Sequence, residues 1–211
     1  MLFAILLALV PFALAAPTPD MSTSSSCPVS SIEVPIIPGI ERAAGEQTIF
    51  STVGRGVQNY TCTAGKWLSA GALADLYDMS CMSTVLSPLF NINQTSTAIA
   101  FGALQAIPFP ATDPSLVKFD HFFVRTAAGG IAPAFRDSRV GIEVVGSLIS
   151  RADSPAGNVT TIPWLHLTAA SGMLSKGVFR THTIGGQAPP SCAAEGRSLS
   201  VPYTAMYYFT A

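Results

Sequence analysis

The chain has 211 residues, which suits one all-β domain with a single buried core. Only 11% of the residues are charged, against the roughly one quarter that is typical of soluble domains, and the net charge is -1. Because no basic field exists, the composition excludes proteins that hold nucleic acid or anionic lipid by charge.

The first residues predict a signal peptide over residues 1–16. An apolar run from Leu2 to Leu14 is too short to span a bilayer, and small residues around Ala15 suit a signal peptidase, with cleavage expected after Ala15 or Ala16. Residues 17–33, rich in Pro and Ser, then form a flexible leader, which argues against a buried N-terminal strand. We expect a secreted protein, extracellular or in the cell wall, with no membrane contact once the signal is removed.

Two kinds of covalent site fit an oxidising, secretory compartment. An even number of cysteines predicts two disulfides with three possible connectivities: Cys27, Cys62, Cys81 and Cys192. Their spacing contains no short Cys-x-x-Cys clip, so no metal site is expected. Three Asn-x-Thr sequons predict N-glycosylation, at Asn59, Asn93 and Asn158.

The folded domain is expected over residues 34–211. Val34–Gly39 is extended because two prolines forbid a helix there. Gln47–Val53 and Val57–Thr63 resemble a hairpin around Gly54-Arg55-Gly56. The stretch Leu68–Met79 is open between helix and strand, since its apolar residues can line one helix face while Gly71 disfavours that reading.

The remaining segments predict further strands, separated by Gly, Pro and Ser. They are Ser96–Phe101, Leu116–Arg125, Val140–Ser147, Thr160–Thr168, Gly177–Ile184 and Leu199–Thr210. Without long helical patterns between them, the expected fold is all-β, an antiparallel β-sandwich or flattened barrel braced by disulfides.

The last strand carries large apolar groups on both faces. By the period of two, one face holds Tyr203, Ala205, Tyr207 and Phe209, and the other holds Thr204, Met206, Tyr208 and Thr210. A strand of this kind is expected in the centre of the sheet, buried on both sides.

Several segments together resemble a known family. They are Gly56–Cys62, Gly71–Asp78, Ile162–Leu167, Arg180–Cys192 and Val201–Phe209. In this order they resemble the secreted family of unknown function DUF3455, in its fungal branch, over roughly residues 47 to 211. The resemblance implies that Cys62 pairs with Cys192, which leaves Cys27 with Cys81.

Some fungal members of that family carry a malate dehydrogenase label, which these residues do not support. Gly54–Asn59 begins like a dinucleotide-binding loop, but Asn59 stands where the third glycine belongs, and strand rather than helix is expected next. We therefore expect no NAD-dependent malate dehydrogenase and no cofactor.

The histidines offer one candidate polar site. If their strands are neighbours, His166 and His182 could share a face with Arg180, since residues 180 and 182 point the same way in a regular pleat. The alternative, which the sequence favours, is that each histidine, including His121, makes one hydrogen bond or faces water, because no third group has metal or triad spacing.

Paired carboxylates could support glycoside hydrolysis, but their spacing places no two of them together. The candidates are Asp75, Asp78, Asp113, Asp120, Asp137, Glu143 and Glu195. No Gly-x-Ser-x-Gly motif for an esterase is present.

The function expected from these observations is a monomeric extracellular or cell-wall-associated binding or structural protein, without catalysis. Its partner is expected to be cell-wall polysaccharide or a host or other extracellular protein. The alternatives are a secreted carbohydrate-active hydrolase and a barrel carrier of a small apolar ligand. Two facing carboxylates in a cleft favour the hydrolase, and an open apolar cavity favours the carrier.

Overall fold

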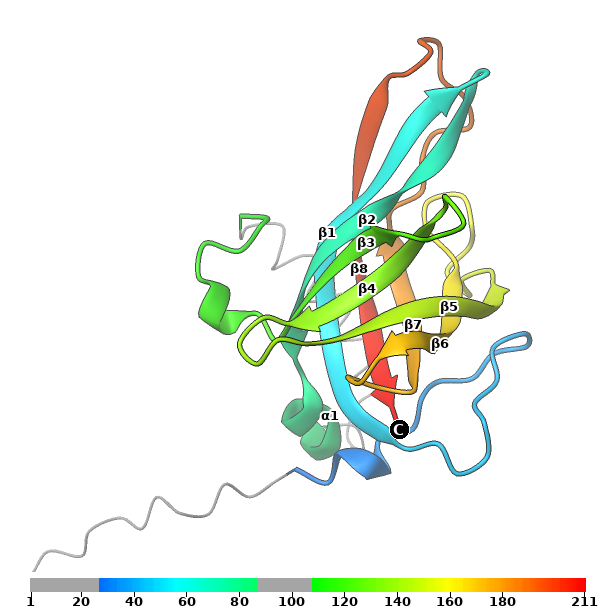
Figure 1. Cartoon of the computed structure of the whole chain (residues 1–211). Coiled ribbons are helices and arrows are strands. Elements are labelled where there is room, and N and C mark those ends of the chain that lie inside the picture. Colours follow the sequence, from blue (N-terminus) through cyan, green and yellow to red (C-terminus); the bar gives the residue numbers. More distant parts are fainter. Residues whose placement is uncertain (1–26, 87–107) are drawn as a thin grey trace, which may run out of the picture.

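The computed structural model describes residues 27–86 and 108–211, and these fold into an eight-stranded antiparallel barrel (Figure 1). Strands follow one another in chain order around the barrel, and β8 pairs with β1 to close it. The all-β, antiparallel prediction is confirmed, with a closed barrel in place of a sandwich. The predicted signal peptide, the Asn93 sequon and the Ser96–Phe101 strand lie outside the described residues.

The elements have the following bounds: η1 Val29–Ser31, β1 Thr48–Thr63, β2 Lys66–Asp78, α1 Ser80–Leu86, η2 Pro114–Leu116, β3 Phe119–Arg125, β4 Ile131–Asp137, β5 Ile142–Ala152, β6 Trp164–Gly172, β7 Gly177–Gly185 and β8 Ser198–Thr210. The ambiguous Leu68–Met79 stretch is therefore strand, within β2. None of the described helices is long and apolar enough to cross a membrane.

Strand β1 is continuous, and the expected hairpin around Gly54-Arg55-Gly56 is wrong. A Cβ at Gly54 would lie 2.7 Å from a ring carbon of Tyr207, and one at Gly56 would lie 2.6 Å from the Cα of Ala74. These glycines therefore mark close packing inside the barrel rather than a turn. The chain reverses instead at Ala64-Gly65, where φ is 50° and 76°, as a two-residue hairpin requires.

Strand β4 has no counterpart among the predicted strands. It follows Gly129-Gly130 directly and contains Pro133, and both features normally argue against a strand. Pairing with β3 and β5 on its two sides overrides that local signal.

The predicted double burial of β8 is confirmed. Its inward side chains, among them Tyr203, Tyr207 and Phe209, belong to the core of the barrel interior. Its outward Met206 and Tyr208 pack in a second cluster with side chains of the N-terminal strap, which we define as residues 27–47. The strap contributes the buried side chains Ile32, Val34 and Ile40 to this outer cluster.

One end of the barrel is filled by aromatic rings. Ring centroids of Phe119 lie 5.2 Å from Phe50 and 4.7 Å from Phe209, and Phe209 lies 5.4 Å from Phe135. This closed end holds the start of β1 and the end of β8, which carries the C-terminus (Figure 1). At the other end, β1, β2 and β8 project beyond the remaining strands (Figure 1).

Both expected disulfides are present. Cys62–Cys192 joins the far end of β1 to the loop before β8, beside backbone hydrogen bonds from Cys62 N to Arg197 O and from Cys192 N to Gly65 O. Cys27–Cys81 joins the strap to α1.

Loss of Cys62–Cys192 is expected to destabilise the fold more than loss of Cys27–Cys81. The two bonds span 130 and 54 residues, for which chain entropy gives about 5 and about 4 kcal/mol. The strap also keeps its apolar contacts when Cys27 is removed. Thermal melting should show the lower midpoint for Cys62→Ala/Cys192→Ala than for Cys27→Ala/Cys81→Ala, and the reverse order would contradict this account.

Candidate functional site

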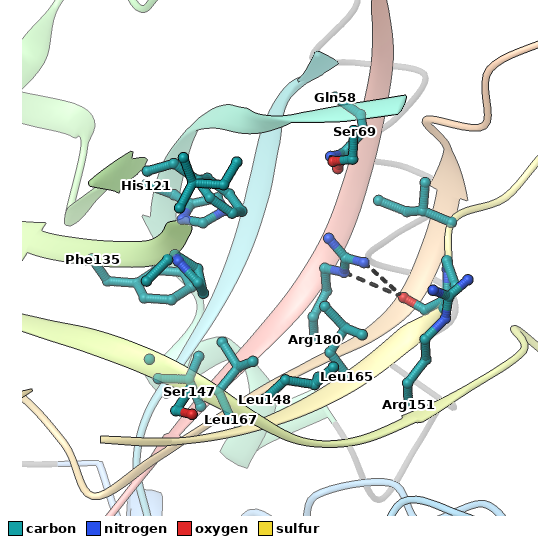
Figure 2. Close-up of a pocket in the computed structure, with 18 of the residues that line it drawn as sticks. Gln58, Ser69, His121, Phe135, Ser147, Leu148, Arg151, Leu165, Leu167 and Arg180 are labelled. Carbon is teal, nitrogen blue, oxygen red and sulfur yellow. Dashed lines mark hydrogen bonds between the residues drawn. The ribbon is translucent and has the colours of Figure 1, made fainter. Parts of the chain in front are cut away.

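The barrel contains a cavity of about 700 Å³ between the aromatic closed end and the projecting hairpin (Figure 2). The inner end of the cavity is formed by buried side chains, including His121, Phe135 and Tyr207. Its mouth is lined by exposed side chains, including Ile131 and Leu148. The cavity is therefore open, and its size lies within the ~300–1,000 Å³ that is typical of small-molecule sites.

A row of four side chains crosses the wall of the cavity. Strand register pairs Arg151 of β5 with Leu165 of β6, Leu165 with Arg180 of β7, and Arg180 with Tyr207 of β8. Directly paired residues point to the same face of a sheet and lie about 5 Å apart. All four line the cavity.

Arg180 is held in place inside the cavity. Its Nε and Nη2 donate hydrogen bonds to the carbonyl oxygen of Pro163 at 3.3 and 3.0 Å, drawn as dashed lines in Figure 2. Its guanidinium also interacts with the Tyr207 hydroxyl. Among the described residues, no carboxylate lies within 4 Å of Arg180 or of Arg151.

His121 forms part of the opposite wall in its neutral form. Its ring stacks on Phe135 with centroids 4.3 Å apart, and Nδ1 lies 3.0 Å from the carbonyl oxygen of Ala134. Since a carbonyl only accepts, Nδ1 carries the proton and Nε2 is an acceptor. Burial lowers the pKa of His121 to about 4, so the ring adds no charge at neutral pH.

Gln58 presents an unpaired acceptor in the wall. Its Nε2 donates to Gly71 O at 2.9 Å and to Ser69 Oγ at 3.2 Å, which fixes the orientation of the amide. The side chain is 7% exposed, and its Oε1 has no hydrogen-bond partner within the described part of the chain. A buried acceptor of this kind calls for a donor from water or a ligand.

The hydroxyl of Tyr207, which lines the cavity, lies 2.8 Å from the hydroxyl of Tyr203, which lies outside the lining. Burial raises the pKa of both phenols. Both therefore stay protonated at neutral pH.

The structure does not bring the three predicted site residues together. Arg180 points into the cavity, whereas His166 lies on the outer face of the barrel, stacked on Phe179 at 3.9 Å. A β-bulge between Thr181 and Ile184 gives His182 a φ of 47°, and its ring lies 4.8 Å from Trp164 of the outer cluster. The expectation that residues 180 and 182 share a face is corrected, because the bulge breaks the period of two.

The predicted acidic candidates do not line the cavity. Asp137 pairs with Lys118 and Arg139, and Glu143 pairs with Arg136. Asp75 accepts a hydrogen bond from Ala111 N, and Glu195 accepts one from Ala64 N. In the described ranges, no group of three or more His, Cys, Asp or Glu side chains could hold a metal ion.

The two described sequon residues lie away from the cavity. Asn59 Oδ1 accepts a hydrogen bond from Ser200 Oγ at 2.7 Å, and exposed Asn158 donates to Asp153 at 3.2 Å. Their glycosylation stays a prediction.

Sequence reasoning missed Arg151, Gln58 and Tyr207 as members of one site. Their positions in the chain carry no motif, and only the closed register places them around one space. The one available signal was the period of two in β8, which put Tyr207 on the inward face.

Comparison with known proteins gives a family without a biochemical role. The family model described as "Protein of unknown function (DUF3455)" matches residues 43–211. No curated protein matches the chain, and no solved structure does.

Burial of His121 should make stability depend on pH. Its pKa is near 6.5 in the unfolded chain and about 4 in the fold, so the unfolded chain gains a proton first as pH falls, and stability is lost through that window. The free energy of unfolding can be measured with denaturant at about pH 7 and about pH 4.5. Between these pH values the wild type should lose on the order of 2 kcal/mol more stability than His121→Gln, which lacks the titrating ring. Parallel losses in both proteins would contradict a buried, neutral His121.

Proposed function

The chain belongs to the DUF3455 family of proteins of unknown function, and we propose that this member is an extracellular carrier that binds one small, largely apolar molecule in its barrel cavity. The observation that carries the proposal is the open cavity of about 700 Å³. Eight strands enclose a space that side chains can fill or that can hold one small ligand.

Because the cavity is open, water fills it when no ligand is bound. A ligand that displaces this water from apolar walls gains free energy by the hydrophobic effect. Filling the cavity with side chains, as at the aromatic closed end, would have been the more stable solution.

The lining suits a mainly apolar ligand with a few polar contacts. Phe135, Leu165, Leu167 and Val178 supply apolar walls, and the polar groups are few and fixed in place by the fold. Apolar lining with a small number of placed polar groups is the usual character of small-molecule sites.

The other functions considered from the sequence find less support. The cavity lining includes no Asp or Glu among the described residues, so a pair of carboxylates for glycoside hydrolysis does not face this space. Gly54–Asn59 lies within β1, hydrogen-bonded to β2 and β8, and it does not lead into a helix whose N-terminus could receive a pyrophosphate.

An extracellular location for the carrier is supported by the two disulfides, which form and persist in oxidising compartments. The apolar N-terminal run in the sequence points the same way.

Binding can be tested with N-phenylnaphthylamine, a neutral apolar dye whose fluorescence rises when it leaves water. We expect saturable binding at one site. Leu148→Trp should weaken dye binding at least about fivefold, because the larger indole takes up space at the mouth of the cavity. A loss of about 1 kcal/mol in binding free energy changes affinity by that factor. The matched control is Ile149→Trp, because both residues are 56% exposed but only Leu148 lines the cavity.

Absence of saturable dye binding would overturn the proposal. Equal weakening by the two tryptophan variants would place the dye on the outer surface and would overturn it as well.

A further inference from the structure

We propose that the cavity selects small apolar carboxylic acids and that Arg180 and Arg151 together bind the carboxylate. This inference rests on the proposed carrier function and names the chemical class of its ligand.

The strand register brings the two cations to one place. Arg151 and Arg180 flank Leu165 on adjacent strands β5, β6 and β7, and all three side chains face the cavity. Figure 2 shows the two arginine side chains on the same side of the cavity, with Arg180 nearer its centre and Arg151 nearer its edge. A bulge in β5 between Leu148 and Ser150 is what returns Arg151 to the inner face.

The charge of the cavity is unbalanced. In the described part of the chain, the charged residues that line the cavity are Arg151 and Arg180. Neither has a carboxylate within 4 Å. The other titratable groups that face this space, among them His121, Tyr60 and Tyr207, are neutral at neutral pH. Arg180 is partly buried, whereas Arg151 is exposed at the edge of the cavity. A partly buried cation without a counter-charge is costly, and an anionic ligand removes that cost.

Arg180 is also oriented to receive a carboxylate. A guanidinium has five N–H donors, and Pro163 O accepts from Nε and Nη2. The remaining N–H groups on Nη1 and Nη2 can donate to the Tyr207 hydroxyl and to an oxygen of the ligand. Because the side chain is already held, binding a carboxylate requires little further ordering.

The body of the ligand has an apolar place to lie. Across from the arginines, the stacked rings of His121 and Phe135 lie beside Tyr207, with ring centroids 5.9 and 5.7 Å from that tyrosine. On the side of the arginines, Leu167 of β6 and Val178 of β7 add apolar lining two residues from Leu165 and Arg180. A ligand with a carboxylate at one end and a flat apolar body at the other matches both parts.

The test compares naphthoate with naphthamide, two probes of the same shape that differ in charge. Calorimetric titration of the wild-type protein should show naphthoate binding at least about tenfold more tightly, as expected for charge-assisted hydrogen bonds. Arg180→Gln keeps a donor for Pro163 O and should lower naphthoate affinity to about that of naphthamide, which abolishes the preference. Arg151→Gln should reduce the preference in part.

The control is Arg197→Gln, which removes the same charge from an exposed position outside the cavity lining. It should retain the full preference for naphthoate. Equal affinity for the two probes in the wild type, or equal loss in Arg197→Gln, would overturn the inference.

Dye binding separates this failure from failure of the carrier function. Saturable dye binding without preference for naphthoate over naphthamide, or without binding of either, refutes the carboxylate inference alone. Absence of saturable dye binding refutes the carrier function and the inference with it.

Discussion

The pairing of β1 with β8 is the constraint on which the rest of the structure depends. Thr48 pairs with Thr210 at one end of this ladder and Thr61 pairs with Ser198 at the other, with one irregularity between Thr48 and Phe50. This pairing converts a meander of antiparallel strands into a closed barrel. Closure gives every strand a partner on both sides along the body of the barrel, and it divides every strand into an inward and an outward face. The strap then covers the outward face of β8, held to α1 by Cys27–Cys81.

Inside this barrel, the densely packed core and the cavity are separated along the axis. Phenylalanine rings fill the closed end, where they supply the dense core that stabilises a domain. In the other half of the interior, the cavity takes the place of packed side chains, so this half lacks that stabilisation. Its lining contains Arg180, Arg151 and the unpaired Oε1 of Gln58. The unpaired Oε1 of Gln58 and the partly buried Arg180, which has no counter-charge, are costly, and such features are expected where a ligand completes the structure.

Much of the fold could be predicted from local patterns, but the site could not. The alternation in β8 predicted which of its residues share a face and that both faces are buried, because that strand is regular where it is buried. His182 was assigned to the wrong face because the bulge after Thr181 is not visible in the sequence. Arg151 was missed for a related reason, since the bulge after Leu148 sets its face. Gly54 and Gly56 suggested a turn, whereas they permit close packing against Tyr207 and Ala74.

The central claim is that the cationic half of the barrel is a binding site for an apolar carboxylate. A crystal structure of the protein grown with naphthoate tests it most directly. The account predicts one naphthoate inside the barrel, with its carboxylate between Arg180 and Arg151 and its rings against Phe135 and His121. Naphthoate bound only on the outer surface, or inside with its carboxylate turned away from both arginines, would contradict it.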